Sequence, residues 1–498
     1  MISLEKKHFK WDGAFIRFIE LFLDLFWIVL SYLVVLLLIN LVKTGSFNAS
    51  INMMFGTGSK NDVPYYMETL WTTIAYLCFG TIFLFIYKPT VTRKNPSSFV
   101  FGILITVLLS NFLIFILTVF APEGYIITVQ GITLVTLLQI VVMTGHKLII
   151  FKIIYSKNLN ECLIVGPKDE AYDLAKKFFI QRLYNRKLKY IYVEENGKID
   201  QYIYELIDQV NHVYLTSQLN EKNKNKIMTY CIARKYVDVY LVPKIYEVGI
   251  INSSIDSVDD RLVFRIDSLH LSVIQRFWKR CFDIIGSLIG LIIFFPLMLL
   301  IAIVIKLYDH GPVFFKQERL TRGKKKFNLI KFRTMIPNAE AKTGAIWAKE
   351  NDDRITKLGK ILRGMRLDEL PQLINVLKGE MSFVGPRPER EVLAEKFMET
   401  NPDFQYRLNV KSGITGLAQT AGRYETKPDD KLRYDLLYIR KYSLFFDIEI
   451  IFYTILSIFD KNSAKGVSLE MSLEEIAKNN QKEMKIEGRK ISFLNQSK

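Results

Sequence analysis

The stretch that decides the fold begins with Arg276-Phe-Trp-Lys279-Arg280-Cys-Phe-Asp283 and continues as an apolar run from Ile284 to Leu307. A cationic segment, Gln317–Met335, comes next, and further on lie Arg366-Leu-Asp368-Glu369-Leu-Pro371-Gln372 and the turn Gly385-Pro386-Arg387-Pro388. Membrane-length apolar sequence, clustered cations and paired carboxylates therefore share one segment. This combination predicts chemistry on an anionic substrate beside a lipid surface.

The composition indicates an integral membrane protein. Half of the 498 residues are hydrophobic, and the formal net charge is +17. In a membrane protein such an excess of Lys and Arg is typical of cytoplasmic loops that face anionic lipid headgroups. No nucleic-acid-binding motif accompanies it, so no nucleic-acid partner is expected. The four cysteines are scattered without CxxC spacing, which argues against a metal knuckle or a disulfide framework.

Four hydrophobic stretches predict a transmembrane helix bundle over residues 1–155. Each is near the length of about 20 residues that a helix needs to cross a bilayer. Lys and Arg lie mainly before the first stretch, between the second and third, and after the fourth, which places both ends of the bundle in the cytoplasm. Glu20 and Asp24 begin the first stretch, and we interpret them as interfacial acids that reach water, with a proton relay as the alternative. The stretches are 20–42, 67–88, 98–120 and 125–147.

Residues 161–270 predict a cytoplasmic α/β domain. Cys162–Gly166 is typical of a buried strand that leads into a helix, and similar alternation continues to residue 242. Such alternation favours a doubly wound, Rossmann-like parallel sheet. The turn Gly166–Ala171 lacks the glycines of the GxGxxG dinucleotide-binding pattern. A structural or regulatory role is therefore favoured over nucleotide binding.

The apolar run 284–307 is compatible with two topologies. It is long enough to span the bilayer, which would place the rest of the chain on the opposite side. Pro296, near its middle, removes a helix hydrogen bond and favours a bend. A bent, re-entrant helix over 279–306 would enter and leave on one face, with Lys279 and Lys306 both at the cytoplasmic headgroups.

The pair Asp368-Glu369 has a structural and a catalytic interpretation. It precedes a helix-like segment with Pro371 in the first turn, so Asp368 is expected as a helix N-cap. An ionised carboxylate can also attack phosphorus, and its neighbour can bind Mg²⁺. The two interpretations are compatible, because helix N–H groups keep a capping carboxylate ionised.

Positive charge for such chemistry is available nearby. Attack on a diphosphate needs cations on its non-bridging and leaving oxygens, and Lys331, Arg333 and Arg387 are the candidates. We expect short elements and an α-rich domain over 311–460, in which the late apolar run Ile448–Phe459 lies in the membrane interface. Charged residues dominate 461–498, where we expect a flexible tail apart from a short helix near Leu469–Ala477.

Five motifs occur in order: Lys331–Met335, Asn351–Ile355, Leu367–Leu373, Asn375–Gly379 and Met381–Pro388. Together they resemble the bacterial sugar transferase family, the polyprenyl-phosphate hexose-1-phosphate transferases or monotopic phosphoglycosyl transferases. The resemblance covers about residues 275–460, which it implies is the catalytic domain. The bundle and the α/β domain before it are similar to the long members that prime capsule, exopolysaccharide or O-antigen synthesis.

The resemblance implies a two-step reaction at the cytoplasmic face of the bacterial inner membrane. An aspartate attacks the β-phosphate of a UDP-hexose, releases UMP and holds the phosphosugar until undecaprenyl phosphate accepts it. Matched by motif, Asp368 is the nucleophile and Glu369 the Mg²⁺ ligand, while Lys331, Arg333 and Arg387 handle phosphate. The family's broken, re-entrant membrane helix matches 279–306, with its break at Pro296.

One departure from the family is visible, and two other classes of function stay open. The family usually has proline where this chain has Ser412, so we expect a looser turn over Lys411–Gly416. A catalytically silent scaffold for polysaccharide assembly enzymes is one alternative, and the intact Asp368-Glu369 pair argues against it. A nicotinamide-dependent enzyme built on 161–270 is the other, and the missing glycines argue against it. A homodimer is compatible with the sequence, although no feature requires one.

Overall fold

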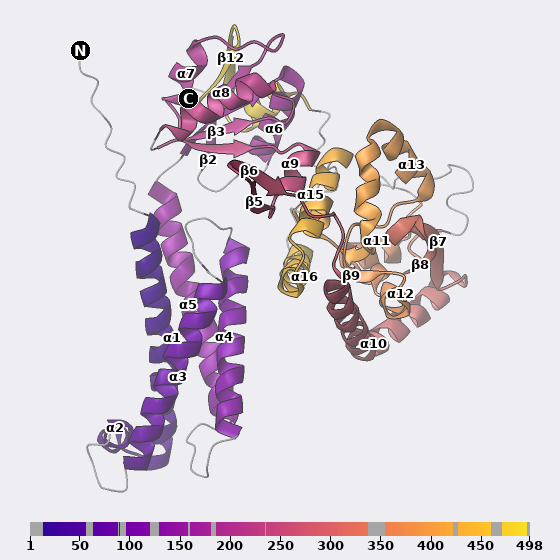
Figure 1. The fold of residues 1–498 in the computed structure, drawn as a ribbon. Coiled ribbons are helices and arrows are strands. Elements are labelled where there is room, and N and C mark those ends of the chain that lie inside the picture. Colours follow the sequence, from indigo (N-terminus) through magenta and orange to yellow (C-terminus); the bar gives the residue numbers. More distant parts are fainter. Residues whose placement is uncertain are drawn as a thin grey trace, which may run out of the picture. The chain divides into compact units, whose positions relative to one another are not determined.

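The computed structural model describes residues 13–55, 63–87, 89, 96–119, 129–157, 160–180, 186–234, 236–336, 354–421, 427–459 and 471–495. The chain divides into two compact units, Met1–Leu159 and Asn160–Lys498. Figure 1 labels many of the helices and strands of both units.

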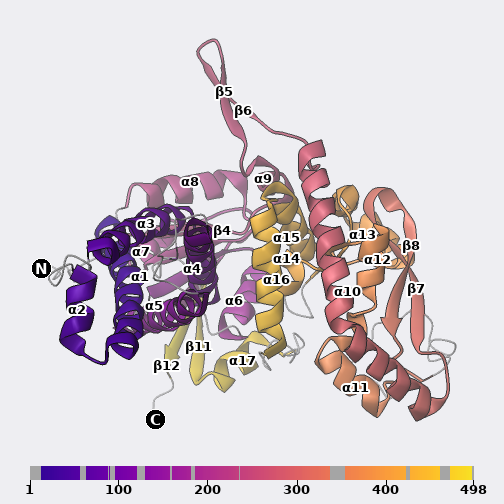
Figure 2. The same ribbon diagram turned by 90° about the horizontal axis from the view of Figure 1, so that it is seen from below.

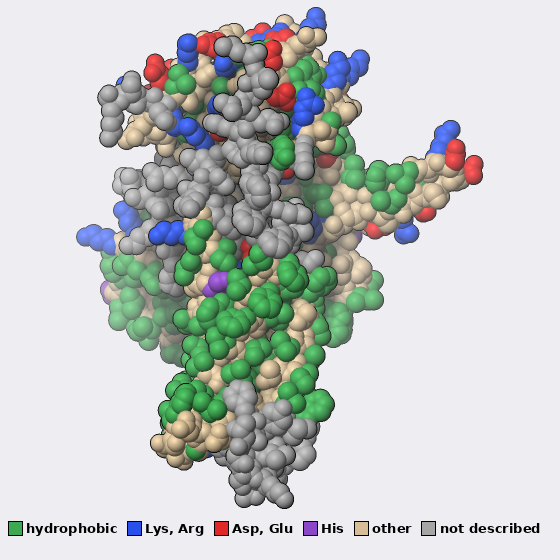
Figure 3. All heavy atoms as spheres, turned by 90° about the vertical axis from the view of Figure 1, so that its left-hand side faces the viewer, with side chains coloured by type: hydrophobic (Ala, Val, Ile, Leu, Met, Phe, Trp, Pro, Cys, Tyr) green, Lys and Arg blue, Asp and Glu red, His purple; other side chains and the backbone are tan. Residues whose placement is uncertain are grey.

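The first unit is helical in its described part. Each of its four long helices has the length and composition to cross a membrane, which confirms the four predicted hydrophobic stretches. The face of this unit drawn in Figure 3 is covered with hydrophobic side chains, as lipid contact requires. A fifth, short helix lies where only a loop was expected. The helices are α1 (Gly13–Thr44), α2 (Phe47–Phe55), α3 (Val63–Tyr87), α4 (Pro96–Val119) and α5 (Val129–Lys157).

Polar side chains connect the four long helices inside this unit. Tyr76 on α3 donates a hydrogen bond to Asn111 on α4 (2.6 Å), and the amide of Asn111 donates to Gln139 on α5 (2.7 Å). The amide of Gln139 donates in turn to the carbonyl of Ile28 on α1 (3.0 Å). Such hydrogen bonds across helices specify their register where the surroundings are apolar.

Glu20 and Asp24 are buried, so the expectation that they reach water is wrong, while their position at the membrane interface stays a prediction. Each is 2% exposed, and Lys147 on α5 is fully buried beside them. The Nζ of Lys147 lies 2.8 Å from Asp24 and 3.4 Å from Glu20. A buried charge needs an opposite charge, and here the partner comes from the far end of the unit's sequence.

The second unit begins with a parallel sheet that is covered by helices on both faces. Its strands pair in the order β2-β1-β3-β4. Alternate residues of β1 face α6 on one side and α7 and α8 on the other. The expected parallel α/β sheet is therefore present. Its elements are β1 (Asn160–Gly166), α6 (Lys168–Ile180), β2 (Arg186–Val193), α7 (Tyr202–Ile207), β3 (His212–Leu215), α8 (Glu221–Ile232) and β4 (Asp238–Leu241).

The C-terminal residues return to this sheet, so the flexible tail expected over 461–498 is wrong for 480–495, while the short helix expected near Leu469–Ala477 is confirmed. Helix α17 (Leu473–Asn479) packs beside α6, and the hairpin of β11 (Lys482–Glu487) and β12 (Lys490–Asn495) adds to β2. Charged side chains are frequent here, but Ile491 and Phe493, which are separated by Ser492, are buried in the core under α6. Apolar residues at every second position, Ile491 and Phe493, are typical of a strand with one face in the core, and they place β12 in the sheet.

A long helix and many short elements form the rest of the second unit. After α9 (Ile245–Ile250), the strands β5 (Ser254–Val258) and β6 (Arg261–Arg265) form an exposed hairpin (Figure 2). The elements beyond it are α10 (Val273–Asp309), β7 (Phe314–Leu320), β8 (Lys326–Phe332), α11 (Lys357–Gly364), the 3₁₀ helix η4 (Leu367–Glu369), α12 (Gln372–Lys378), β9 (Ser382–Val384), α13 (Glu391–Thr400), the 3₁₀ helix η5 (Pro402–Asn409), β10 (Gly413–Thr415), α14 (Leu417–Ala421), α15 (Pro428–Arg440) and α16 (Leu444–Phe459).

Helix α10 is the fifth helix with the length and composition of a membrane span. It has 37 residues, contains Pro296, and begins with a capping box in which Ser272 and Gln275 bond each other's backbone N–H. Its ribbon bends in Figures 1 and 2, as expected for a helix with an internal proline. Whether it re-enters one membrane face stays a prediction.

Candidate active site

The paired acids lie in a short turn between two helices. After α11 the chain passes through Arg366 in a left-handed conformation (φ 55°), and Asp368 and Glu369 follow in η4. Helix α12 then starts with Pro371 as its N-cap. The expected role of Asp368 as the N-cap is therefore wrong. A proline suits the first positions of a helix because its missing N–H would have no partner there, and Asp368 stays available for chemistry.

Glu369 contacts two of the predicted phosphate-handling cations. Its Oε1 lies 2.9 Å from the Nζ of Lys331 on β8 and 3.4 Å from a guanidinium nitrogen of Arg387, in the turn after β9. Burial alone raises the pKa of a carboxyl, but Lys331, Arg387 and Arg366 outweigh it and lower the pKa of Glu369 to about 2. Glu369 is therefore ionised at neutral pH.

Asp368 has the opposite electrostatic environment. Its side chain is 8% exposed. Burial and the negative charge of Glu369 raise the pKa of Asp368 to about 6, although Lys331, Arg363 and Arg387 act to lower it. At pH 7 such a carboxyl is still ionised in about nine molecules of ten, and it is more basic than an ordinary aspartate. Neighbouring acids whose pKa values are pushed apart are typical of catalytic sites.

A pocket beside the pair collects three of the predicted site residues, Lys331, Glu369 and Arg387. The structure puts Arg333, the third candidate cation, against Gly311 at the end of α10, where a Cβ would collide with its guanidinium. Sequence analysis missed the other residues of the pocket, and it also missed Arg363 on α11. These lining residues are Arg319, Leu329, Gln372, Pro388, Gly413 and Ile414.

Close backbone packing and a buried ion pair hold the turn that carries Arg387. β9 and β10 run in parallel, and a Cβ on Gly385 or Gly413 would collide with the other strand's end. Behind the turn, Arg407 donates to the carbonyl of Arg387 (3.0 Å) and to the carboxylate of Asp435 (2.9 Å). Arg407 and Asp435 are both buried. The position of the Arg387 backbone is thus determined from two sides.

Ser412 does not loosen the turn before β10, so that expectation is wrong. Its hydroxyl donates to the carbonyl of Leu320 (2.9 Å), and its N–H donates to the hydroxyl of Thr321 (3.3 Å). Both bonds connect the turn to the end of β7. A proline has no N–H and no hydroxyl, so serine replaces the rigidity of the ring with two hydrogen bonds.

The apolar helix α10 is anchored to the elements around the pocket. The guanidinium of Arg280 donates to the last carbonyls of α12, at Val376 and Leu377 (2.7 Å each). Asp283 accepts hydrogen bonds from the hydroxyl of Ser382 (2.9 Å) and from a backbone N–H of β9 (3.0 Å). The apolar helix α10 is therefore connected directly to α12 and β9.

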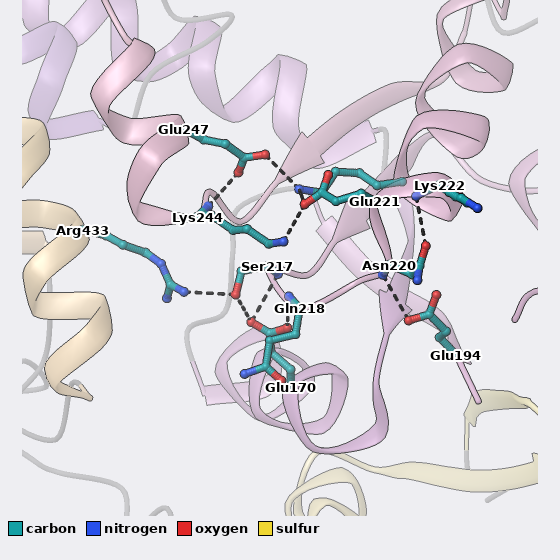
Figure 4. A network of polar contacts seen from close by, with 11 residues as sticks. Glu170, Glu194, Ser217, Gln218, Asn220, Glu221, Lys222, Lys244, Glu247 and Arg433 are labelled. Atoms are coloured by element: carbon teal, nitrogen blue, oxygen red, sulfur yellow. Dashed lines mark hydrogen bonds and ion pairs between the residues drawn. The ribbon is translucent and has the colours of Figure 1, made fainter. Parts of the chain in front are cut away.

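The carboxyl edge of the α/β sheet is filled by the protein's own side chains (Figure 4). In open parallel sheets ligands bind at this edge where the strand order reverses, here between β1 and β3. The carboxylate of Glu170 accepts hydrogen bonds from the N–H groups of Ser217 (3.2 Å) and Gln218 (2.8 Å), so these two donors are already used. Arg433 of α15 donates to the hydroxyl of Ser217 (3.0 Å) and to the carbonyl of Pro243 (2.8 Å). These contacts argue against the nicotinamide alternative.

The acids fit a magnesium ion only if a substrate supplies further ligands. Among the residues that the structure describes, no three acidic, histidine or cysteine side chains gather as a metal site. Both cation contacts of Glu369 go to Oε1, which leaves its Oε2 for another partner. Magnesium is commonly held by one or two carboxylates together with substrate phosphates, and Glu369 fits that mode.

Comparison with known proteins points to the same segment. Residues 274–461 match the family described as bacterial sugar transferase. A UDP-N-acetylgalactosamine-undecaprenyl-phosphate N-acetylgalactosaminephosphotransferase of Aeromonas hydrophila is 40% identical over 229 residues, which are 45% of this chain and 53% of that protein. A UDP-glucose:undecaprenyl-phosphate glucose-1-phosphate transferase of Escherichia coli K12 is 35% identical over 261 residues, 51% of this chain and 56% of that protein.

A shorter relative is matched over most of its length. The exopolysaccharide production protein ExoY of Rhizobium meliloti is 36% identical over 191 residues, which are 36% of this chain and 83% of that protein. The chain thus spans about half the length of the first two relatives and most of the third.

Proposed function

Because the chain belongs to the bacterial sugar transferase family, we propose that it transfers a hexose-1-phosphate from a UDP-sugar to undecaprenyl phosphate. The reaction releases UMP and is the priming step of capsular polysaccharide, exopolysaccharide or O-antigen synthesis. One observation carries the proposal. Asp368 and Glu369 are adjacent and have oppositely shifted pKa values, and Glu369 lines one pocket together with Lys331 and Arg387.

In the first step, a carboxylate oxygen of Asp368 attacks the β-phosphorus of the UDP-sugar. The bond from that phosphorus to the oxygen bridging the two phosphates breaks, UMP leaves with the electron pair, and an aspartyl phosphosugar remains. In the second step, a phosphate oxygen of undecaprenyl phosphate attacks the same phosphorus and frees the carboxylate. Neither step as written needs a proton acceptor or a redox partner.

The surrounding charges support attack by one anion on another. Lys331 and Arg387 supply positive charge at the pocket for the oxygens that gain charge in the transition state. Glu369 would hold Mg²⁺ together with the donor's phosphates, and the ion supplies further charge neutralisation there. Arg333 keeps its proposed phosphate-handling role only if a substrate reaches the end of α10.

The acceptor is a membrane lipid, and the apolar helix α10 suits a position in the same membrane. Beyond Asp283 its surface is mostly apolar and exposed, including Ile285, Ile292 and Phe295. We place it in the membrane as a re-entrant helix broken at Pro296, so that the pocket lies at the cytoplasmic face, where UDP-sugars are made. Direct contacts from α10 to α12 and β9 would then hold the pocket at the headgroups of the same leaflet.

The test is UMP release by the detergent-solubilised full chain with Mg²⁺ and undecaprenyl phosphate. The donors are UDP-glucose, UDP-galactose and UDP-N-acetylgalactosamine. Asp368→Asn should release no UMP, while Asp429→Asn, an exposed aspartate of α15, should match wild type. Retention of activity in Asp368→Asn would remove Asp368 as the nucleophile. If wild type releases UMP from no donor and traps no phosphosugar, the scaffold alternative is favoured.

A further inference from the structure

Gln372 is a buried amide with an unused donor. Its side chain is 2% exposed, and its Nε2 has no hydrogen-bond partner among the described residues. Asn375, one turn later on α12, shows the contrast. Its amide nitrogen donates to the carbonyl of Asn328 (2.8 Å) and to Glu380 (2.6 Å), and its oxygen accepts from the N–H of Ile330 (3.1 Å). Buried amides are nearly always bonded in this way, so the free donor needs an explanation.

Gln372 is one of the residues that line the pocket beside Glu369. It follows Glu369 by one helical turn and shares the pocket with Lys331, Arg319 and Arg387. A pocket with this many cations takes an anion, and the oxygens of an anion accept hydrogen bonds. A neutral N–H adds one more donor without adding a charge that Glu369 would attract into an ion pair.

We infer that Gln372 donates a hydrogen bond from Nε2 to an oxygen of the phosphate that is transferred. The inference rests on the proposed function and names a residue that touches the substrate. Gln372 lies four residues after Asp368. On this assignment its donor serves the phosphorus that Asp368 attacks and not the phosphate that leaves in UMP. The same bond holds the phosphosugar while it waits for the lipid acceptor.

Gln372→Leu tests the contact, because leucine keeps the side chain's bulk and removes both polar atoms. Gln405→Leu, at an exposed position of η5, is the matched control. UMP release from UDP-glucose and UDP-N-acetylgalactosamine should fall about tenfold to a hundredfold in Gln372→Leu, as for the loss of one donor to a charged oxygen. Its melting temperature should not fall, since the buried unused donor is gone. Inhibition by UMP, which lacks the transferred phosphate, should be unchanged.

Three results would overturn the inference. The first is a wild-type rate in Gln372→Leu. The second is an equal weakening of UMP inhibition, since the side chain would then act on the leaving phosphate or on the fold. The third is a Gln372→Glu variant that is more active than Gln372→Leu. The inference predicts the opposite order, because a carboxylate there repels both Glu369 and the substrate. An inactive wild type is a different result, in which the proposed function fails and this inference fails with it.

Discussion

Replacing the two acids one at a time is expected to change stability in opposite directions. The pKa of Asp368 is about 6, compared with 3.8 for an unperturbed aspartate. Above pH 6 the folded protein therefore carries a charge that costs about 3 kcal/mol more than in the unfolded chain, at 1.36 kcal/mol for each pH unit of difference. Asp368→Asn keeps the shape and removes the charge, so it should stabilise the protein by up to about 3 kcal/mol at pH 7.5.

For Glu369 the sign is reversed. Its pKa is about 2, compared with 4.5 for an unperturbed glutamate, so the ionised carboxylate contributes about 3 kcal/mol of stability above pH 4.5. That contribution is lost only as the pH falls towards 2. Glu369→Gln should therefore destabilise the protein at pH 7.5. The loss is smaller than the full amount, because Asp368 is freed from the negative charge that helps to raise its pKa.

Thermal unfolding of detergent-solubilised protein at pH 7.5, 6 and 5 separates these effects. The folded-state carboxyl of Asp368 takes up its proton as the pH falls through 6, so the advantage of Asp368→Asn should shrink towards pH 5 and vanish near pH 4. A change of about 3 kcal/mol in the free energy of unfolding corresponds to a shift of roughly 6–12 °C in melting temperature for a domain of the size of residues 274–461. Asp429→Asn controls for the loss of an acid. An Asp368→Asn protein that melts at or below the wild-type temperature at pH 7.5, or keeps the same advantage at pH 5, refutes the reasoning.

Three further perturbations test the reaction and the fold. If Asp368 is the nucleophile, kcat/KM for the UDP-sugar should fall about tenfold for each pH unit below 6, since only the ionised carboxylate attacks. A flat pH profile of kcat/KM between pH 5 and 7 would contradict this. Arg407→Lys keeps the charge but cannot bond both Asp435 and the carbonyl of Arg387, so the rate of UMP release should fall about tenfold or more. An unchanged rate would show that the turn with Arg387 does not need the hydrogen bonds from Arg407. Pro296→Ala restores a helix hydrogen bond and should straighten α10, which moves residue 330 to the opposite face in cysteine-accessibility labelling and abolishes activity. Unchanged labelling and full activity would show that Pro296 does not set the topology.

Sequence patterns were sufficient wherever one periodicity decides the structure. The four long apolar helices and the strands of the α/β sheet follow from runs of 20 or more apolar residues and from alternating short strands. Motifs also marked Lys331, Glu369 and Arg387, and the structure brings these three into contact, while the catalytic roles of the marked residues stay predictions. Arg333 shares a motif with Lys331 but packs against Gly311, so a motif alone does not specify orientation.

What sequence analysis missed depends on partners that lie far away in the chain. Lys147 neutralises Asp24 from another helix, and no local pattern near Asp24 announces it. Gln372 was quoted within a motif without a role, because its significance lies in the hydrogen bonds that it does not make. The charged C-terminus was mistaken for a flexible tail, since average composition hides the alternation of Ile491 and Phe493 that adds β12 to the sheet.

Helix α15 gives the α/β sheet a physical connection to the active site even though its ligand edge is filled. Arg433 and Asp435 are two residues apart, which is about 200° around a helix, so they point to nearly opposite sides. Arg433 bonds the sheet edge at Ser217, and Asp435 bonds Arg407, which holds the backbone of Arg387. Buried side chains of α15 also hold this helix in the core. If Arg387 handles phosphate as proposed, its contribution depends on its position, and a sheet that fixes α15 also helps to fix Arg387.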